Sequence, residues 1–295
     1  MMTKNQFSVL TTMEACSEPL TQREIAYKTG LSLGSVNRIY SQLSDEGFVA
    51  DGAISEQGLQ ALEPFRVKRA VFIAAGFGSR LVPVTINTPK PLVRVHGQRL
   101  IDHSIDACIK AGIEEIYIVR GYLAEQFDQL LYKYPNIKFI ENEKYNESNN
   151  ISSAVLAKDY MKNAYVFEAD LLLYNPDIIT KYQYESNYIG VPVEKTDDWC
   201  FHTKPNGVIT KIGIGGTDCY HMFGISYWTY EDGEKLAKHL PLSMQRPGGK
   251  EMFWDLCPLG DFKKEYKVHI RPCNFDDVIE IDTFSELKQL DPSYA

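Results

Sequence analysis

The sequence predicts an α/β domain with a mixed, mainly parallel sheet, preceded by a small, mostly helical domain. A continuous apolar run at residues 70–75 is typical of a parallel strand that is buried on both faces. After it, short strand-like segments alternate with amphipathic helical segments, as in sheets joined by crossover helices. Helical patterns predominate before residue 67, so we expect one domain over residues 1–66 and a second over residues 67–295.

The composition is that of a soluble globular protein, with 295 residues, 44% of them hydrophobic, and a net charge of −8. The acidic balance makes nucleic-acid binding a poor candidate for the main activity. Because we find neither an apolar run of about eighteen residues nor a signal-peptide profile, we expect a cytoplasmic protein without a membrane partner. The six cysteines lack metal-ligand spacing, and we expect reduced thiols.

The first domain has the start signals of several short helices. Thr21 and Glu24 match a capping box, and Ser32 can cap the helix that follows. Residues 47–54 are typical of a small β-hairpin, and residues 55–62 predict a further helix. This order of helices and hairpin resembles the winged helix-turn-helix domain of bacterial regulators.

The resemblance implies a DNA-facing helix with Ser35, Asn37 and Arg38 toward the groove. The charge of the domain argues against this function, because residues 1–66 hold five Lys and Arg against eight Asp and Glu. A module that reads a DNA groove normally has a basic face. DNA therefore stays open as a partner but is not favoured, and the alternative is dimerisation or packing, which also leaves a homodimer open.

The second domain predicts strands and helices in alternation. We expect strands at residues 70–75, 115–119, 138–140 and 165–169, and helices at residues 101–111, 123–132 and 152–159. In the first of these helices, Ile101, Ile105, Cys108 and Ile109 recur at helical spacing and are expected to face the core. Gly112 marks the end of that helix.

A glycine-rich loop follows the first strand of this domain. Glycines in that position let backbone N–H groups come close to a phosphate, and Arg80 and Lys90 add positive charge. The dinucleotide-binding fingerprint fails because Leu81 stands where it needs a third glycine. A P-loop fails as well, because no Gly-Lys-Ser/Thr follows.

The full string, from Ala74-Ala75-Gly76-Phe77-Gly78 to Thr88-Pro89-Lys90-Pro91-Leu92, resembles the signature of nucleotidyltransferases that act on nucleoside triphosphates and phosphorylated small molecules. The resemblance implies a Rossmann-like nucleotidyltransferase domain. It assigns Arg80 and Lys90 to catalysis, where they neutralise the phosphates. The expected nucleotide-binding residues are Ala74, Ala75, Gly76, Gly78, Ser79, Arg80, Lys90, Asn146, Asn150 and Ser153.

Two aspartates are candidate metal ligands. Asp170 follows the strand at residues 165–169, and Asp282 lies in the apolar segment at residues 278–283. Carboxylates that converge from separate strands suit Mg²⁺, which prefers oxygen ligands, and the family keeps its metal ligands in these places. Glu280 lies on the same face of its strand as Asp282 and is a candidate partner of the site.

Within this family the sequence is similar to the bacterial CTP:phosphocholine cytidylyltransferases of the LicC type. The similarity is carried by residues 145–153, 197–201 and 252–255 and by Glu280-Ile281-Asp282-Thr283. It implies CTP and phosphocholine as partners, with CDP-choline and pyrophosphate as products. A quaternary ammonium ion is held by aromatic faces and nearby carboxylates. The expected substrate-binding residues are Tyr145, Asp198, Trp199, Tyr220, Phe253, Trp254, Asp255 and Glu280.

The implied mechanism is Mg²⁺-assisted, in-line attack of the substrate's phosphate on the α-phosphorus of CTP. Since the attacking oxygen is already an anion, the reaction needs alignment and charge neutralisation more than a base. Three alternatives stay open. A site with aromatics and carboxylates could also hold 2-aminoethylphosphonate or phosphoethanolamine, and the chain could be a ligand-sensing regulator with a degenerate transferase domain. A sugar 1-phosphate is less favoured, because its hydroxyl groups need many polar partners.

Overall fold

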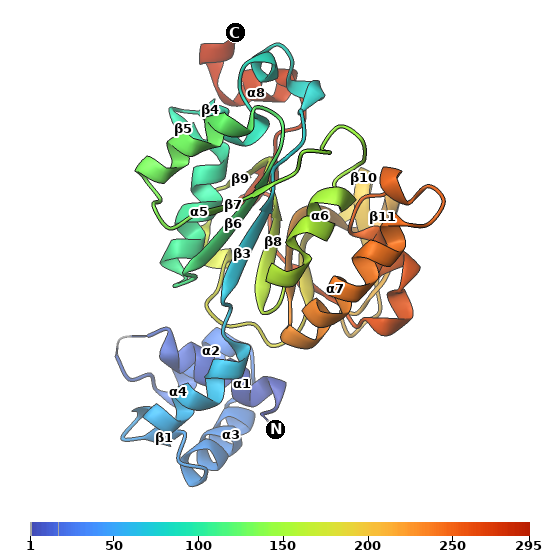
Figure 1. Ribbon diagram of the computed structural model, residues 1–295. Coiled ribbons are helices and arrows are strands. Elements are labelled where there is room, and N and C mark those ends of the chain that lie inside the picture. Colours follow the sequence, from blue (N-terminus) through green and yellow to red (C-terminus); the bar gives the residue numbers. More distant parts are fainter. Residues whose placement is uncertain (1, 17) are drawn as a thin grey trace. The chain divides into compact units, whose positions relative to one another are not determined.

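The computed structural model describes residues 2–16 and 18–295 (Figure 1). The chain divides into two compact units. The first unit runs to Arg66 and includes the later segment Tyr182–Tyr184. The second unit comprises Val67–Lys181 and Glu185–Ala295. No helix among the described residues combines the length and the apolar character that a membrane span requires.

The first unit is built from short capped helices and one two-stranded hairpin. Its elements are α1 (Lys4–Glu14), α2 (Gln22–Thr29), α3 (Leu33–Asp45), β1 (Val49–Ala50), β2 (Ala53–Ile54) and α4 (Glu56–Leu62). The expected capping box is confirmed, because the hydroxyl of Thr21 accepts the backbone N–H of Glu24 and the side chain of Glu24 returns to Thr21. Ser32 caps α3 as expected.

The core of this first unit contains two tyrosines from much later in the chain. Tyr182 packs against the buried cluster, and Tyr184 stacks on Phe65 with ring centroids 5.4 Å apart and an angle of 11°. The hydroxyl of Tyr184 also donates to the carbonyl oxygen of Met2 at 3.0 Å. The buried apolar residues of this core are Val9, Leu10, Met13, Ile25, Val36, Ile39, Leu43, Val49 and Leu62.

The second unit contains a seven-stranded sheet in the order β12-β10-β11-β8-β3-β6-β7. Its strands are β3 (Arg69–Ile73), β6 (Glu115–Arg120), β7 (Lys138–Glu141), β8 (Ala164–Glu168), β10 (Asn187–Thr203), β11 (Ile209–Trp228) and β12 (His269–Pro272). Strands β8, β3, β6 and β7 are mutually parallel, whereas β11 runs antiparallel to both β8 and β10. The prediction of an α/β fold with a mixed, mainly parallel sheet is confirmed.

Two small strand pairs complete this unit. They are β4 (Arg94–Val95) with β5 (Gln98–Arg99), and β9 (Leu171–Leu173) with β13 (Val278–Glu280). The second pair matters for the site, because it joins the segment that follows β8 to a segment about a hundred residues later in the chain.

The helices of this unit are α5 (Leu100–Lys110), α6 (Ile151–Ala157), α7 (Tyr230–Met244) and α8 (Phe284–Leu290). Two expectations are corrected. The segment Ala124–Tyr132 is a 3₁₀ helix with tight i to i+3 bonds, such as Gln126 N–H to Leu123 C=O. In α5, Ile109 is 51% exposed because it lies at the edge of the buried face in the last turn.

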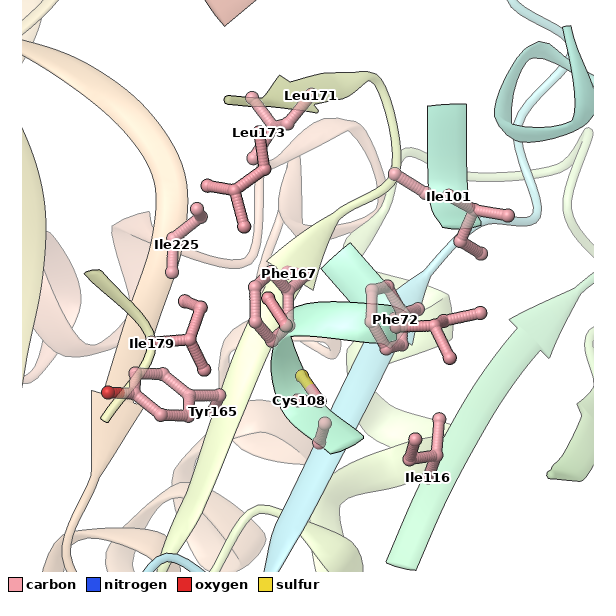
Figure 2. Packing of buried hydrophobic residues seen from close by; sticks show 14 of the residues in the cluster. Phe72, Ile101, Cys108, Ile116, Tyr165, Phe167, Leu171, Leu173, Ile179 and Ile225 are labelled. Atoms are coloured by element: carbon pink, nitrogen blue, oxygen red, sulfur yellow. The ribbon is translucent and has the colours of Figure 1, made fainter. Parts of the chain in front are cut away.

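Hydrophobic side chains hold β3 and β8 side by side. The rings of Phe72 on β3 and Phe167 on β8 stack with centroids 4.7 Å apart, and Figure 2 shows them next to Cys108 and Ile101 of α5. All four side chains are buried. This packing fixes the carboxyl ends of the two strands relative to each other, and those ends carry the site.

Candidate active site

The carboxyl ends of β3 and β8 border a cavity of about 640 Å³. Ligands of open α/β sheets bind at this end of the strands. Most of the residues expected from the sequence line the cavity. They are Ala74, Ala75, Gly76, Gly78, Ser79, Arg80, Lys90, Tyr145, Asn150, Ser153, Asp170, Asp198, Trp199, Phe253, Asp255, Glu280 and Asp282.

The glycine loop needs a glycine at position 78. Gly78 has a φ of +68°, in the left-handed region, and a Cβ there would lie 2.9 Å from the Cβ of Lys90. A larger residue would therefore strain the backbone and push Lys90 away. The glycine thus brings the loop and Lys90 together in the lining of the cavity.

Lys90 lies between two aspartates. Its Nζ is 2.9 Å from Asp170 Oδ2 and 3.3 Å from Asp282 Oδ1. Although burial lowers the pKa of Lys90, the two carboxylates raise it by more, so the pKa is above its usual value and the side chain is charged. Arg80 donates to Asp282 at 2.6 Å from an exposed position. The two cations proposed for the phosphates therefore share one carboxylate.

The pairing of β9 with β13 brings Asp170 and Asp282 together. The N–H of Ile281 donates to the carbonyl oxygen of Asp170 at 3.2 Å. Carboxylate oxygens of Glu168, Asp170 and Glu280 lie within 4.8 Å of one another. Among the residues that the structure describes, the buried Oδ1 of Asp170 has no hydrogen-bond partner. An all-oxygen set with one oxygen unused fits Mg²⁺.

Sequence reasoning missed Glu168, the last residue of β8. Its carboxylate lines the same cavity, and Asn150 Nδ2 donates to its Oε1 at 3.1 Å. Burial and the nearby carboxylates of Asp255 and Asp170 raise the pKa of Glu168 well above its usual value. The period of a strand could have found it, because Glu168 lies two residues before Asp170 and so on the same face.

Asp255 is a second carboxylate in the floor of the cavity. It is 3% exposed, and its Oδ1 accepts the hydroxyl of Tyr188 at 2.6 Å. Burial raises the pKa of Asp255 to about 6, and the bond from Tyr188 opposes this shift. Glu168 and Asp255 thus place two carboxyl groups in the lining of the cavity, and we call this pair the acidic floor.

Aromatic side chains form one wall. Trp199 and Phe253 meet edge to face with centroids 5.5 Å apart, and both line the cavity together with Tyr145. Trp254 is placed differently from the sequence expectation. It is 2% exposed and packs against the ring of Trp228 at 5.9 Å.

The position of Trp254 has a physical reason. A large indole is stabilised by burial among other aromatic rings, while its neighbours Phe253 and Asp255 take the cavity-lining positions. Two further expected residues also lie outside the cavity lining. Tyr220, on β11, is partly buried against the core, and Asn146 is an exposed loop residue.

Comparison with known proteins shows the family to which the chain belongs. Residues 69–198 match the nucleotidyl transferase family model, and residues 5–51 match the model of the IclR helix-turn-helix domain. The 2-aminoethylphosphonate cytidylyltransferase of Lancefieldella rimae is 37% identical over 229 residues, which cover 77% of this chain and 93% of that protein. The chain belongs to the nucleotidyl transferase family.

Further relatives of this nucleotidyl transferase are named as choline-phosphate cytidylyltransferases. The choline-phosphate cytidylyltransferase of Haemophilus influenzae is 31% identical, over 76% of this chain and 98% of that protein. The solved structure of the CTP:phosphocholine cytidylyltransferase from Streptococcus pneumoniae has a TM-score of 0.71 at 31% identity, covering 78% of this chain and all of that one. The resemblance expected from the glycine-loop signature is confirmed, as is the helix-turn-helix resemblance of the N-terminal region.

Proposed function

We propose that the protein transfers the cytidylyl group of CTP to a small phosphonate or phosphate that carries an ammonium group, and that 2-aminoethylphosphonate fits the site best. One observation carries the proposal: one cavity is lined by two cations, by carboxyl groups and by aromatic rings. Arg80 and Lys90 can bind phosphate oxygens, and Glu168 and Asp255 form the acidic floor. The names of the relatives support CTP as the nucleotide.

The reaction is a direct displacement. An oxygen of the substrate's phosphonate forms a bond to the α-phosphorus of CTP, and the bond from that phosphorus to the bridging oxygen of the β-phosphate breaks. Pyrophosphate leaves with that oxygen. Arg80 and Lys90 neutralise the phosphates, and no proton has to be removed from the nucleophile, which is an anion at neutral pH.

Mg²⁺ is the cofactor that we propose. Asp170 and Asp282 would hold it, with Glu280 beside them. When bound, it supplies positive charge that binds and polarises phosphate oxygens. Lys90, which bridges the same two aspartates, would add its own positive charge to neutralise the phosphates.

The floor of the cavity favours a primary ammonium. Such a group has three N–H donors and needs acceptors, and the carboxylates of Glu168 and Asp255 are acceptors. A quaternary ammonium has no donor and binds to aromatic faces instead. Trp254 lies in the core and adds no such face. Trp199 and Phe253 do line the cavity, so phosphocholine, the substrate expected from the sequence, is the second candidate.

The test measures pyrophosphate release with Mg²⁺. CTP, UTP, ATP and GTP are each combined with 2-aminoethylphosphonate, phosphoethanolamine, phosphocholine and glucose 1-phosphate. We expect the highest kcat/KM with CTP and 2-aminoethylphosphonate. A preference for phosphocholine would leave the reaction intact and replace the substrate. Absence of turnover with every pair would overturn the proposal and favour a ligand-sensing regulator.

A further inference from the structure

Asn150 uses both ends of its amide group inside the protein. Its Nδ2 donates to Oε1 of Glu168 at 3.1 Å, and its Oδ1 accepts the backbone N–H of Trp254 at 2.8 Å. It stands at the start of α6, yet its side chain makes no cap to that helix. The side chain therefore connects β8 with the segment that carries Phe253 and Asp255.

From these contacts we infer that Asn150 is a positioning residue for the substrate's ammonium group, not a nucleotide contact as the sequence suggested. The inference rests on the proposed function. By donating to one oxygen of Glu168, a residue that lines the cavity, Asn150 orients that carboxylate and leaves its other oxygen without this bond. By holding the N–H of Trp254, it fixes the backbone one residue before Asp255. One amide thus sets the spacing of the two acceptors.

Asn149 provides a matched control, because it fastens the same segment without touching Glu168. Its Nδ2 donates to the carbonyl oxygen of Glu251 at 3.2 Å, and its backbone N–H donates to that of Lys250 at 2.7 Å. An Asn149→Ala variant removes this side-chain bond and the bond that Asn149 Oδ1 accepts from the backbone N–H of Asn150 at 2.7 Å, but it leaves the side-chain bonds of Asn150 in place. Any effect that depends on the orientation of Glu168 should therefore be confined to variants of Asn150.

The experiment compares Asn150→Ala and Asn150→Ser with Asn149→Ala. Serine is included because it can cap α6 and so favours folding. We measure KM for 2-aminoethylphosphonate, KM for CTP, and Ki for ethylphosphonate, a competitor without the ammonium. In the Asn150 variants we expect KM for the amine to rise about tenfold, as for the loss of a hydrogen bond to a charged group. The other two constants should change less than about twofold.

Three results would overturn this role for Asn150. An equal rise of KM for CTP would make it a nucleotide contact, and unchanged constants would make it irrelevant to binding. The same rise in Asn149→Ala would assign the effect to general loosening of the segment. A wild-type enzyme that turns over no ammonium substrate would refute the proposed function itself, whereas an active wild type with any of these three results would refute only the role of Asn150.

Discussion

Asp255 is the residue at which we expect pH to act on substrate binding. Burial raises the pKa of its carboxyl to about 6, so the group is charged above that pH and neutral below it. A neutral carboxyl attracts an ammonium far less. As the pH falls from about 7 to about 5, we expect KM for 2-aminoethylphosphonate to rise roughly tenfold. Ki for ethylphosphonate, measured at the same pH values, controls for titration of the phosphonate.

The variant Asp255→Asn separates this charge from the packing around it. Asparagine still accepts a hydrogen bond from Tyr188, but it has no charge at any pH. We expect a high KM for the amine that no longer depends on pH. A variant that keeps the wild-type pH dependence would show that another group titrates.

The same variant, which weakens substrate binding, should raise the free energy of unfolding at neutral pH. Because the pKa of Asp255 is raised in the folded state, ionisation destabilises the fold as the pH rises from about 4 to above 6. Asp255→Asn lacks this loss, so its free energy of unfolding at pH 7 should exceed the wild-type value by about 3 kcal/mol. The difference should disappear near pH 4. Urea unfolding at the two pH values measures it.

At the scale of elements, strand β11 comes close to Glu168 at Gly224. A Cβ at Gly224 would lie 2.5 Å from Cγ of Glu168, so Gly224→Ala has to displace that carboxylate. We expect at least a fivefold rise, on the order of 1 kcal/mol, in KM for the amine, with KM for CTP preserved. Gly213→Ala in the same strand is the control, because the nearest atom to its Cβ is 3.9 Å away. Equal behaviour of the two variants would contradict this role of Gly224.

Some strands could be predicted from the sequence and others could not. Apolar runs located the parallel strands β3, β6, β7 and β8, and the glycine loop located one part of the cavity lining, because each signal lies in one continuous segment. The long antiparallel strands β10 and β11 gave no such signal, since their exposed, glycine-containing halves alternate irregularly and contain bulges.

The acidic floor could be predicted only in part, for a related reason. Glu168 and Asp255 and their hydrogen-bond partners Asn150 and Tyr188 come from four separate segments, and only the fold brings them together. Whether Trp254 or its neighbours face the cavity depends on packing against Trp228 on a distant strand. A local pattern holds no information about either arrangement.

At the scale of the whole molecule, the first unit depends on residues far outside its own stretch of sequence. Tyr182 and Tyr184 are part of its core or stack on its rings. A chain that starts at residue 67 should keep its turnover but aggregate, because two tyrosines lose their packing. We expect Tyr182→Ser with Tyr184→Ser to restore a monodisperse state, measured by light scattering. A truncated chain that is monodisperse without these changes would contradict the expectation.

DNA binding by the helix-turn-helix unit is also tested on the whole molecule. Residues 1–66 hold more acidic than basic groups, so we expect no appreciable DNA binding in a mobility-shift assay. The assay is run at about 50 and about 200 mM salt, because phosphate contacts weaken steeply over that range. A shift at low salt that is lost at high salt would assign a DNA-binding role to this unit.

The segment Tyr182–Tyr184 also restricts how such a protein can arise or be rebuilt. Recombination that joins a helix-turn-helix gene to a transferase gene supplies one junction, near residue 66, but the unit found here also includes three residues from the interior of its neighbour's sequence. Moving the unit to another enzyme therefore requires transplanting that interior segment as well. A transplanted unit made of residues 1–66 alone would lack Tyr182–Tyr184.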